Sequence, residues 1–119
     1  MKSMLIIDSS EIIARLYTDV FERRSWNVAV CADQRAALNR LAGDDRYDAV
    51  VLGYHVPGTD GAGLVKFLRS LEHRRTTAVV MVTGDDHGKE AGLAAGADEV
   101  LIRPVNPYAL IWAVDKHVR

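Results

Sequence analysis

The stretch Tyr47–Gly63, YDAVVLGYHVPGTDGAG, combines a buried strand, a turn and the start of a helix. Its apolar run Ala49–Leu52 predicts a strand that ends at Gly53. The pair Pro57–Gly58 is a turn signal, and Asp60 is a residue type that caps helices. The stretch therefore predicts one β-turn-α unit, with a glycine at the carboxyl end of its strand.

Four further β-α units flank this one along the chain. Short apolar runs predict their strands, and each run is followed by residues with helical periodicity, which begin at capping residues such as Ser9 or Ser10, Asp33 and Asn106. The four predicted strands are Met4–Ile7, Trp26–Cys31, Ala78–Val82 and Val100–Ile102. Continuous apolar strands that alternate with helices predict an α/β fold, a five-stranded parallel sheet covered on both faces. We expect the doubly wound, flavodoxin-like strand order 2-1-3-4-5 in a single domain over residues 1–119.

Two helices carry specific packing expectations. In the first helix, apolar spacing places Ile13, Leu16, Val20 and Phe21 on one inward face. The fourth predicted helix contains Gly88 and Gly92, and each glycine costs about 1 kcal/mol relative to alanine in a helix. We therefore expect the fourth helix to be short, frayed or partly irregular.

The composition excludes several classes of protein. The chain has 119 residues, of which 49% are hydrophobic and 26% charged, so a packed core is expected. The net charge of −1 argues against a nucleic-acid-binding domain. The arginine pairs Arg23–Arg24 and Arg74–Arg75 are interpreted as solvated helix ends.

The expected location is the cytoplasm. Cys31 is the only cysteine, so the chain can form no intrachain disulfide and is expected to bury this thiol. No apolar run is long enough to span a bilayer. Asp8 comes too early for a signal peptide, and the sequence therefore predicts a soluble domain without a membrane segment.

In an open α/β sheet the functional crevice lies at the carboxyl ends of the strands. The residues there are Asp8, Ser9, Gly53, Thr83 and Arg103, which precedes Pro104. Their ordered placement over the whole chain resembles the receiver domains of bacterial two-component response regulators, of the chemotaxis-regulator type. The resemblance implies a role in phosphorelay signal transduction.

The resemblance also implies which positions have changed. Receivers carry two acids after the first strand, and here they are matched by Asp8 and Ser9. Gly53 stands where the family has its phosphoacceptor aspartate, and Arg103 stands where it has a lysine. The hydroxyl after the fourth strand is kept as Thr83, whereas Val100 matches an aromatic switch residue. The chain is therefore interpreted as an atypical receiver, or pseudo-receiver.

The charges of this site predict little affinity for a metal. Asp8 is its one carboxylate and Arg103 its one cation, so we expect weak or absent Mg²⁺ binding and no cofactor. One hypothesis is that Arg103 reaches across the space at Gly53 and pairs with Asp8. The alternative is that Arg103 points into solvent.

Two alternatives to a silent site remain open. His55 lies two residues after Gly53 and could accept a phosphoryl group, because an imidazole is nucleophilic. The emptied crevice could instead hold a small ligand. Asp85 and Asp86 are most simply helix caps.

The last helix carries the best interaction signal. Tyr108, Trp112 and Asp115 fall on its outer side, and the face that receivers commonly use for partners also includes Val100. The alternative is that Trp112 folds down over the edge of the fifth strand. We expect a non-enzymatic, phosphorylation-independent interaction module that binds a signalling protein or effector domain, and a homodimer through the last helix is a further expectation.

Overall fold

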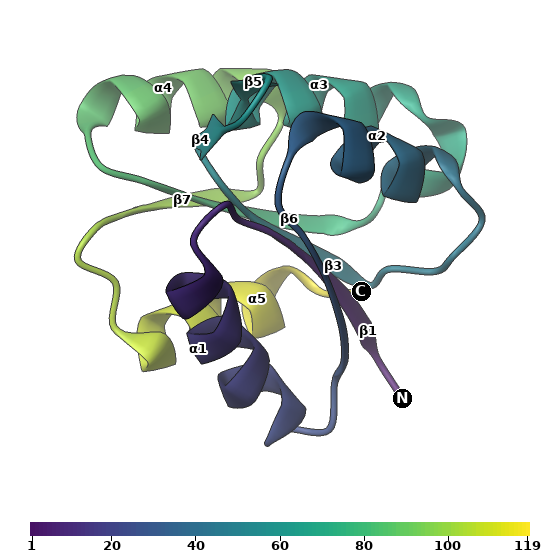
Figure 1. Cartoon of the computed structure of the whole chain (residues 1–119), viewed down its shortest axis with the longest axis vertical. Coiled ribbons are helices and arrows are strands. Elements are labelled where there is room, and N and C mark those ends of the chain that lie inside the picture. Colours follow the sequence, from purple (N-terminus) through teal and green to yellow (C-terminus); the bar gives the residue numbers. More distant parts are fainter.

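The computed structural model describes all residues, 1–119, and consists of one central sheet between two layers of helices (Figure 1). The strands of the sheet are β1 (Ser3–Ile7), β2 (Asn27–Cys31), β3 (Ala49–Gly53), β6 (Ala78–Thr83) and β7 (Glu99–Ile102). They are parallel and lie in the order β2-β1-β3-β6-β7, which confirms the predicted topology. The helices are α1 (Glu11–Glu22), α2 (Gln34–Ala42), α3 (Gly61–Ser70), α4 (Asp86–Ala95) and α5 (Pro107–His117), with a short 3₁₀ turn, η1 (Glu72–Arg74).

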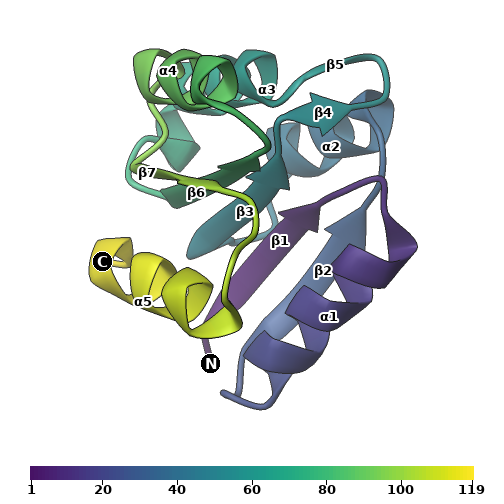
Figure 2. The ribbon, with the colours of Figure 1, turned by 90° about the vertical axis from the view of Figure 1, so that its left-hand side faces the viewer.

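The two faces of the sheet are covered by different helices. Helices α1 and α5 lie on one face, and α2, α3 and α4 lie on the other (Figure 2). Side chains alternate along β1, so Leu5 and Ile7 join one buried cluster while Met4 and Ile6 join the other. All four side chains are fully buried, which explains the continuous apolar run of this strand.

Helix starts follow the capping signals of the sequence. The side chains of Ser10, Asp33 and Asp60 accept hydrogen bonds from the first turns of α1, α2 and α3. Asp85 caps α4 in the same way, and Asn106 caps α5, with Pro107 at its first position. These predicted caps are confirmed, and Ser10 rather than Ser9 serves α1.

The expectation of an irregular fourth helix is wrong. Helix α4 runs regularly from Asp86 to Ala95 and ends at Gly96, whose φ of 113° lies in the left-handed region. Its internal glycines, Gly88 and Gly92, are buried against the sheet. The close approach of α4 to the sheet leaves no room for a side chain at these two positions, which explains the glycines. Helix propensity alone does not predict this approach.

The predicted inward face of helix α1 is confirmed for Phe21 and, as partly buried residues packed on the core, for Ile13 and Val20, but it is wrong for Leu16. Ala14, Tyr17 and Phe21 are its buried residues, whereas the side chain of Leu16 is 45% exposed. With 3.6 residues per turn, residue 16 points more than a third of a turn away from the direction shared by residues 14, 17 and 21. Leu16 is therefore an outward residue.

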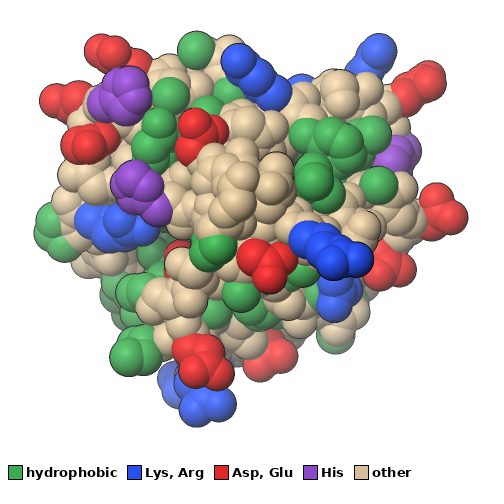
Figure 3. Space-filling model, turned by 45° about the horizontal axis from the view of Figure 1, so that its top comes forward, with side chains coloured by type: hydrophobic (Ala, Val, Ile, Leu, Met, Phe, Trp, Pro, Cys, Tyr) green, Lys and Arg blue, Asp and Glu red, His purple; other side chains and the backbone are tan.

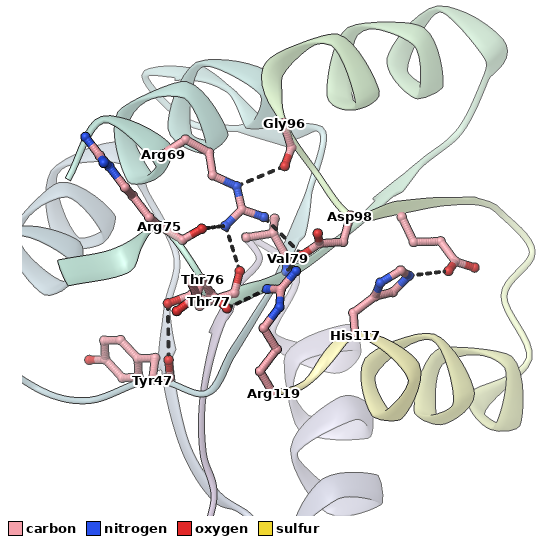
Figure 4. Close-up of polar contacts among 11 residues, drawn as sticks. Tyr47, Arg69, Arg75, Thr76, Thr77, Val79, Gly96, Asp98, His117 and Arg119 are labelled. Atoms are coloured by element: carbon pink, nitrogen blue, oxygen red, sulfur yellow. Dashed lines mark hydrogen bonds and ion pairs between the residues drawn. The ribbon is translucent and has the colours of Figure 1, made fainter. Parts of the chain in front are cut away.

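A polar network ties the amino ends of two strands to α3 (Figure 4). Arg69, on α3, donates hydrogen bonds to the carbonyls of Gly96 and Thr77 and pairs with Asp98 at 3.0 Å. Asp98 also accepts a hydrogen bond from the backbone N–H of Val79 at 2.8 Å. The Arg69–Asp98 pair thus fixes the starts of β6 and β7.

Arg74 is not a solvated helix end, contrary to the expectation. It is 2% exposed and donates hydrogen bonds to the carbonyls of Leu41, Gly43 and Asp45 at the end of α2. A cation at a helix carboxyl end satisfies unpaired carbonyls and complements the helix dipole. Burial lowers the pKa of Arg74, and the neighbouring Tyr47 ring, 4.8 Å away, and Asp45 oppose that shift.

Cys31 is buried, as expected, at the end of β2. Burial raises the pKa of its thiol to about 11, so little thiolate forms near neutral pH. No helix of the chain is both long and apolar enough to cross a membrane.

Replacement of Arg74 by alanine should lower the free energy of unfolding by roughly 3 kcal/mol, because several helix-end carbonyls lose their donor. Urea unfolding measures the change. Arg75→Ala is the matched control, since Arg75 is exposed and its side chain makes no hydrogen bond, and it should fall within about 0.5 kcal/mol of the wild type. Equal losses in the two variants would contradict the capping role.

Candidate functional site

Three of the predicted site residues meet at the carboxyl edge of the sheet. Gly53 ends β3, Asp8 follows β1, and Arg103 follows β7. An ideal Cβ built on Gly53 would lie 3.5 Å from Oδ2 of Asp8 and 3.8 Å from Nη2 of Arg103. A methyl group therefore fits above Gly53, where it would touch one carboxylate and one guanidinium.

Asp8 is oriented by its own loop. One of its oxygens, Oδ1, accepts a hydrogen bond from the backbone N–H of Ser10 at 2.8 Å, which leaves Oδ2 toward Gly53. Ser9 lies between Asp8 and Ser10 in the chain and is exposed. The predicted pair of positions after β1 thus supplies one carboxylate to the crevice.

Arg103 lies over the glycine positions of two strand ends. Its Nη2 approaches the Cβ position of Gly53, and its Nη1 lies 3.8 Å from the Cβ position of Gly84. The backbone N–H of Arg103 donates to the carbonyl of Thr83 at 2.8 Å. The hypothesis of a pair with Asp8 is wrong, because no nitrogen of Arg103 comes within 4.0 Å of a carboxylate oxygen.

Tyr17 is a site residue that sequence reasoning missed. It is 6% exposed and lies on the face of α1 that packs against the sheet. Burial raises the pKa of its hydroxyl, the Asp8 carboxylate raises it further, and Arg103 lowers it. The inward spacing of residues 14, 17 and 21 was the signal that could have identified Tyr17.

Thr83 does not face the crevice. Its side chain is fully buried, and its hydroxyl has no hydrogen-bond partner. Its methyl-bearing carbon would lie 2.8 Å from a Cβ on Gly88, so the side chain is inserted under the first turn of α4. The hydroxyl predicted for the site is therefore directed toward the helix.

His55 lies in a small hairpin next to the crevice. Strand β4 (His55–Val56) pairs antiparallel with β5 (Thr59–Asp60) around the turn at Pro57–Gly58. The exposed imidazole of His55 packs edge-on against Tyr54, with ring centres 5.0 Å apart, and Tyr54 also meets His87 at 6.2 Å. These rings form a surface cluster, and no carboxylate or carbonyl contacts His55 as a base would.

The surroundings of the crevice show neither a metal cluster nor a deep pocket. No three histidine, cysteine or acidic side chains converge as ligands anywhere in the chain. The five main hollows of the surface lie elsewhere, and one of them is lined by Asn27–Ala29, Arg40 and Tyr47. Figure 3 shows acidic, basic and histidine side chains interspersed on the side that it views, with no large area of one sign.

Helix α5 exposes two of its aromatic residues. Tyr108 is 79% and Trp112 64% exposed, so Trp112 does not fold down over β7. The ammonium of Lys116 lies 4.3 Å from the centre of the Trp112 ring and pairs with Glu99 at 2.9 Å. Asp115 pairs with Arg24 of the α1 end at 3.1 Å.

Val100 cannot belong to this exposed face. It is 5% exposed and lies beneath α4, where a Cβ on Gly92 would come within 2.9 Å of its methyl group. The close seating of α4 on the sheet is the physical reason. The exposed residues of the predicted face are therefore Tyr108, Trp112 and Asp115.

Known proteins resemble this chain along nearly all of its length. Residues 4–115 match the model of the response regulator receiver domain. The transcriptional regulatory protein CpxR of Escherichia coli is 31% identical over 93% of this chain. A putative response regulator of Chloroflexus aurantiacus superposes with a TM-score of 0.90 at 29% identity, covering 97% of this chain and 95% of that one. CheY4 of Vibrio cholerae, a chemotaxis response regulator, gives 0.90 at 27% identity, covering 99% of both chains.

The curated relatives are longer than this chain. The match covers 47% of CpxR and 48% of the transcriptional regulatory protein ResD of Bacillus subtilis. The chain thus spans about half the length of the curated relatives that it matches.

Substitution by alanine should affect the free energy of unfolding much less at Gly53 than at Gly61. Gly53→Ala should leave the free energy of unfolding within about 1 kcal/mol, because its Cβ would meet only ordinary contacts. Gly61→Ala should cost roughly 2 kcal/mol or more, since its Cβ would overlap the Gly53 carbonyl and come within 3.0 Å of the Tyr54 Cα. Thermal unfolding of both variants measures the two changes. An equal loss of stability in the two variants would show that Gly53 has no room for a methyl group.

Proposed function

The chain belongs to the response regulator receiver domain family, and from this premise we propose that it is a pseudo-receiver of two-component signalling. In this proposal it acts as a protein-interaction and regulatory module that works without phosphorylation. Receiver domains are signalling modules that act through other proteins, such as histidine kinases and effectors. The proposal assigns this chain the same kind of partner.

Gly53 is the observation that carries the proposal. It ends β3 at the position that the resemblance assigns to the phosphoacceptor, and a glycine has no atom that can attack phosphorus. Phosphoryl transfer also needs a cation to neutralise developing charge, held by carboxylates. Asp8 is the one carboxylate next to the Cβ position of Gly53, with Ser9 beside it in the chain, so Mg²⁺ has little to bind there.

The positive charge of Arg103 supports the same interpretation. Its guanidinium reaches over Gly53 and Gly84 and brings a permanent cation to the crevice. A fixed positive charge next to a single carboxylate further disfavours a divalent ion. The crevice is thus proposed to be neutral without metal or phosphate.

We propose that the surface through which this domain binds its partner is centred on Trp112. The ring is exposed, yet Lys116 covers part of it and is itself held by Glu99. An aromatic side chain that is ordered before binding loses less entropy when a partner covers it. Tyr108, one turn earlier, enlarges the aromatic surface, and we propose that a partner protein or a second copy of this chain binds there.

A receiver phosphorylated on His55 is the second candidate. Its support is that His55 is exposed and close to the crevice, whereas its packing on Tyr54 gives it no activating base. A ligand-binding domain is a third candidate, and the main hollows of the surface do not favour it, because they lie away from Gly53.

Incubation with acetyl phosphate or phosphoramidate and Mg²⁺, followed by intact-mass measurement, tests the proposal. The wild-type chain should gain no phosphoryl group. The control is the triple variant Ser9→Asp/Gly53→Asp/Arg103→Lys, which regains the family's acids and lysine and should gain one. A stoichiometric adduct on the wild type would overturn the proposal, and its loss in His55→Ala would establish the second candidate.

Trp112→Ala tests the proposed surface. It should weaken self-association or partner binding by about tenfold or more, which corresponds to about 1.4 kcal/mol. Sedimentation over a concentration series measures self-association, and a pull-down from the source cell followed by titration measures the partner. Ile12→Ala is the matched control, because Ile12 is 80% exposed but lies on α1. Unchanged association in Trp112→Ala would remove this surface from the proposal.

A further inference from the structure

The two edges of the sheet are protected to different degrees. Strand β7 forms one edge; it begins at Glu99, which pairs with Lys116, and it is followed by Arg103–Pro104. Strand β2 forms the other edge (Figure 2), and its sequence Asn27–Cys31, NVAVC, contains no charged residue and no proline. Its pairing with β1 is continuous, so no bulge turns the strand away. Charges, prolines and bulges keep exposed edges from pairing, and β2 has none of them.

The free hydrogen-bonding groups of this edge belong to Val28 and Val30. The N–H of Asn27 and the carbonyl of Cys31 are hydrogen-bonded to the backbone immediately before and after β1. Alternate residues of a parallel strand bond to opposite sides, so Asn27, Ala29 and Cys31 turn toward β1. Val28 and Val30 therefore direct their N–H and carbonyl groups away from the sheet. Val30 also has 42% of its side chain exposed.

A second copy of β2 fits this edge in the antiparallel orientation. With Ala29 on a two-fold axis, Val28 of each copy lies opposite Val30 of the other. Such opposed residues exchange their N–H and carbonyl groups in an antiparallel ladder, so the arrangement uses all the free backbone groups of both valines. Their β-branched side chains also pack well against neighbours on a pleated surface. The edge is thus self-complementary, as a two-fold interface requires.

Helix α1 supplies matching charges beside this edge. Glu22 lines the same surface hollow as Asn27 and Val28, so it borders the amino end of β2. Arg15 lies about two turns before Glu22 and therefore on the same side of α1. Both side chains are exposed, and neither forms an ion pair within the chain. A two-fold axis at β2 sets two α1 helices antiparallel, so that Arg15 of each copy faces Glu22 of the other.

We propose that β2 is a dimerisation edge, at which a second copy of this chain extends the sheet by antiparallel β2–β2 pairing. Strand pairing alone buries little surface, and the α1 helices beside it enlarge the contact toward the size of a stable interface. The proposal goes beyond the proposed function and does not depend on it. Tyr108 and Trp112 lie on α5, which packs over β6 and not over β2, so both stay open to a different partner protein.

Sedimentation over a concentration series tests the proposal with variants of the two edges. The wild-type chain should form a dimer, and Val30→Lys should weaken self-association by about tenfold or more, because it places a charge among the paired valines. Ile102→Lys is the matched control, since Ile102 is a β-branched residue of the other edge strand and is 36% exposed. This control should self-associate as the wild type does. Amide hydrogen exchange at Val28 and Val30 should slow as the protein concentration rises.

The charges of α1 provide a second test that leaves the strand unchanged, also for the case in which Val30→Lys does not fold. Arg15→Glu should weaken the dimer, since like charges then face each other across the axis. Arg15→Glu/Glu22→Arg should restore the dimer, because the exchanged charges pair again.

A wild-type chain that stays monomeric over the whole series would overturn the proposal, as would a dimer that neither Val30→Lys nor Arg15→Glu weakens. Loss of the dimer in Trp112→Ala, with unchanged association in Val30→Lys, would place the second copy on α5 and would also overturn it. None of these measurements involves a phosphoryl group. A phosphoryl adduct in the mass measurement would therefore defeat the proposed function and leave the dimerisation edge standing.

Discussion

The parallel pairing of five strands is the constraint on which the rest of the structure depends, because it assigns different tasks to the two ends of the sheet. At the amino ends, charged groups are fixed by many partners: Arg69 joins α3 to Asp98, and Arg74 closes the end of α2. At the carboxyl ends, Asp8 and Arg103 border an open space and do not pair. The charged groups held by several partners therefore lie at one end of the strands. The unpaired groups of the crevice lie at the other end, about one strand length away.

Local signals predicted the parts of this structure that local forces decide. Apolar runs marked the strands, and Asp33, Asp60 and Asn106 marked the helix starts, because each needs only a few neighbouring residues to act. The same reasoning failed where the environment of a residue depends on contacts with residues far away in the sequence. The burial of Arg74 depends on carbonyls some thirty positions away, and the glycines of α4 are explained only by Met81 and Val100.

The candidate site shows the same division. The positions of Asp8, Gly53 and Arg103 at one edge follow from topology, and the sequence predicted them correctly. The direction of Thr83 and the presence of Tyr17 do not follow from topology, since both depend on how helices seat on the sheet. A pair between Asp8 and Arg103 was a reasonable expectation from charge alone, but the Ser10 N–H orients the carboxylate and Arg103 extends toward Gly84 instead.

The open space at Gly53 has a consequence for the evolution of this chain. A Cβ at position 53 would meet only ordinary contacts with Asp8 and Arg103, so the backbone of β3 can accept a side chain there. A return toward an acceptor site involves Ser9, Gly53 and Arg103 together, and of these three positions Gly53 is the one where the surrounding contacts already leave room for a Cβ.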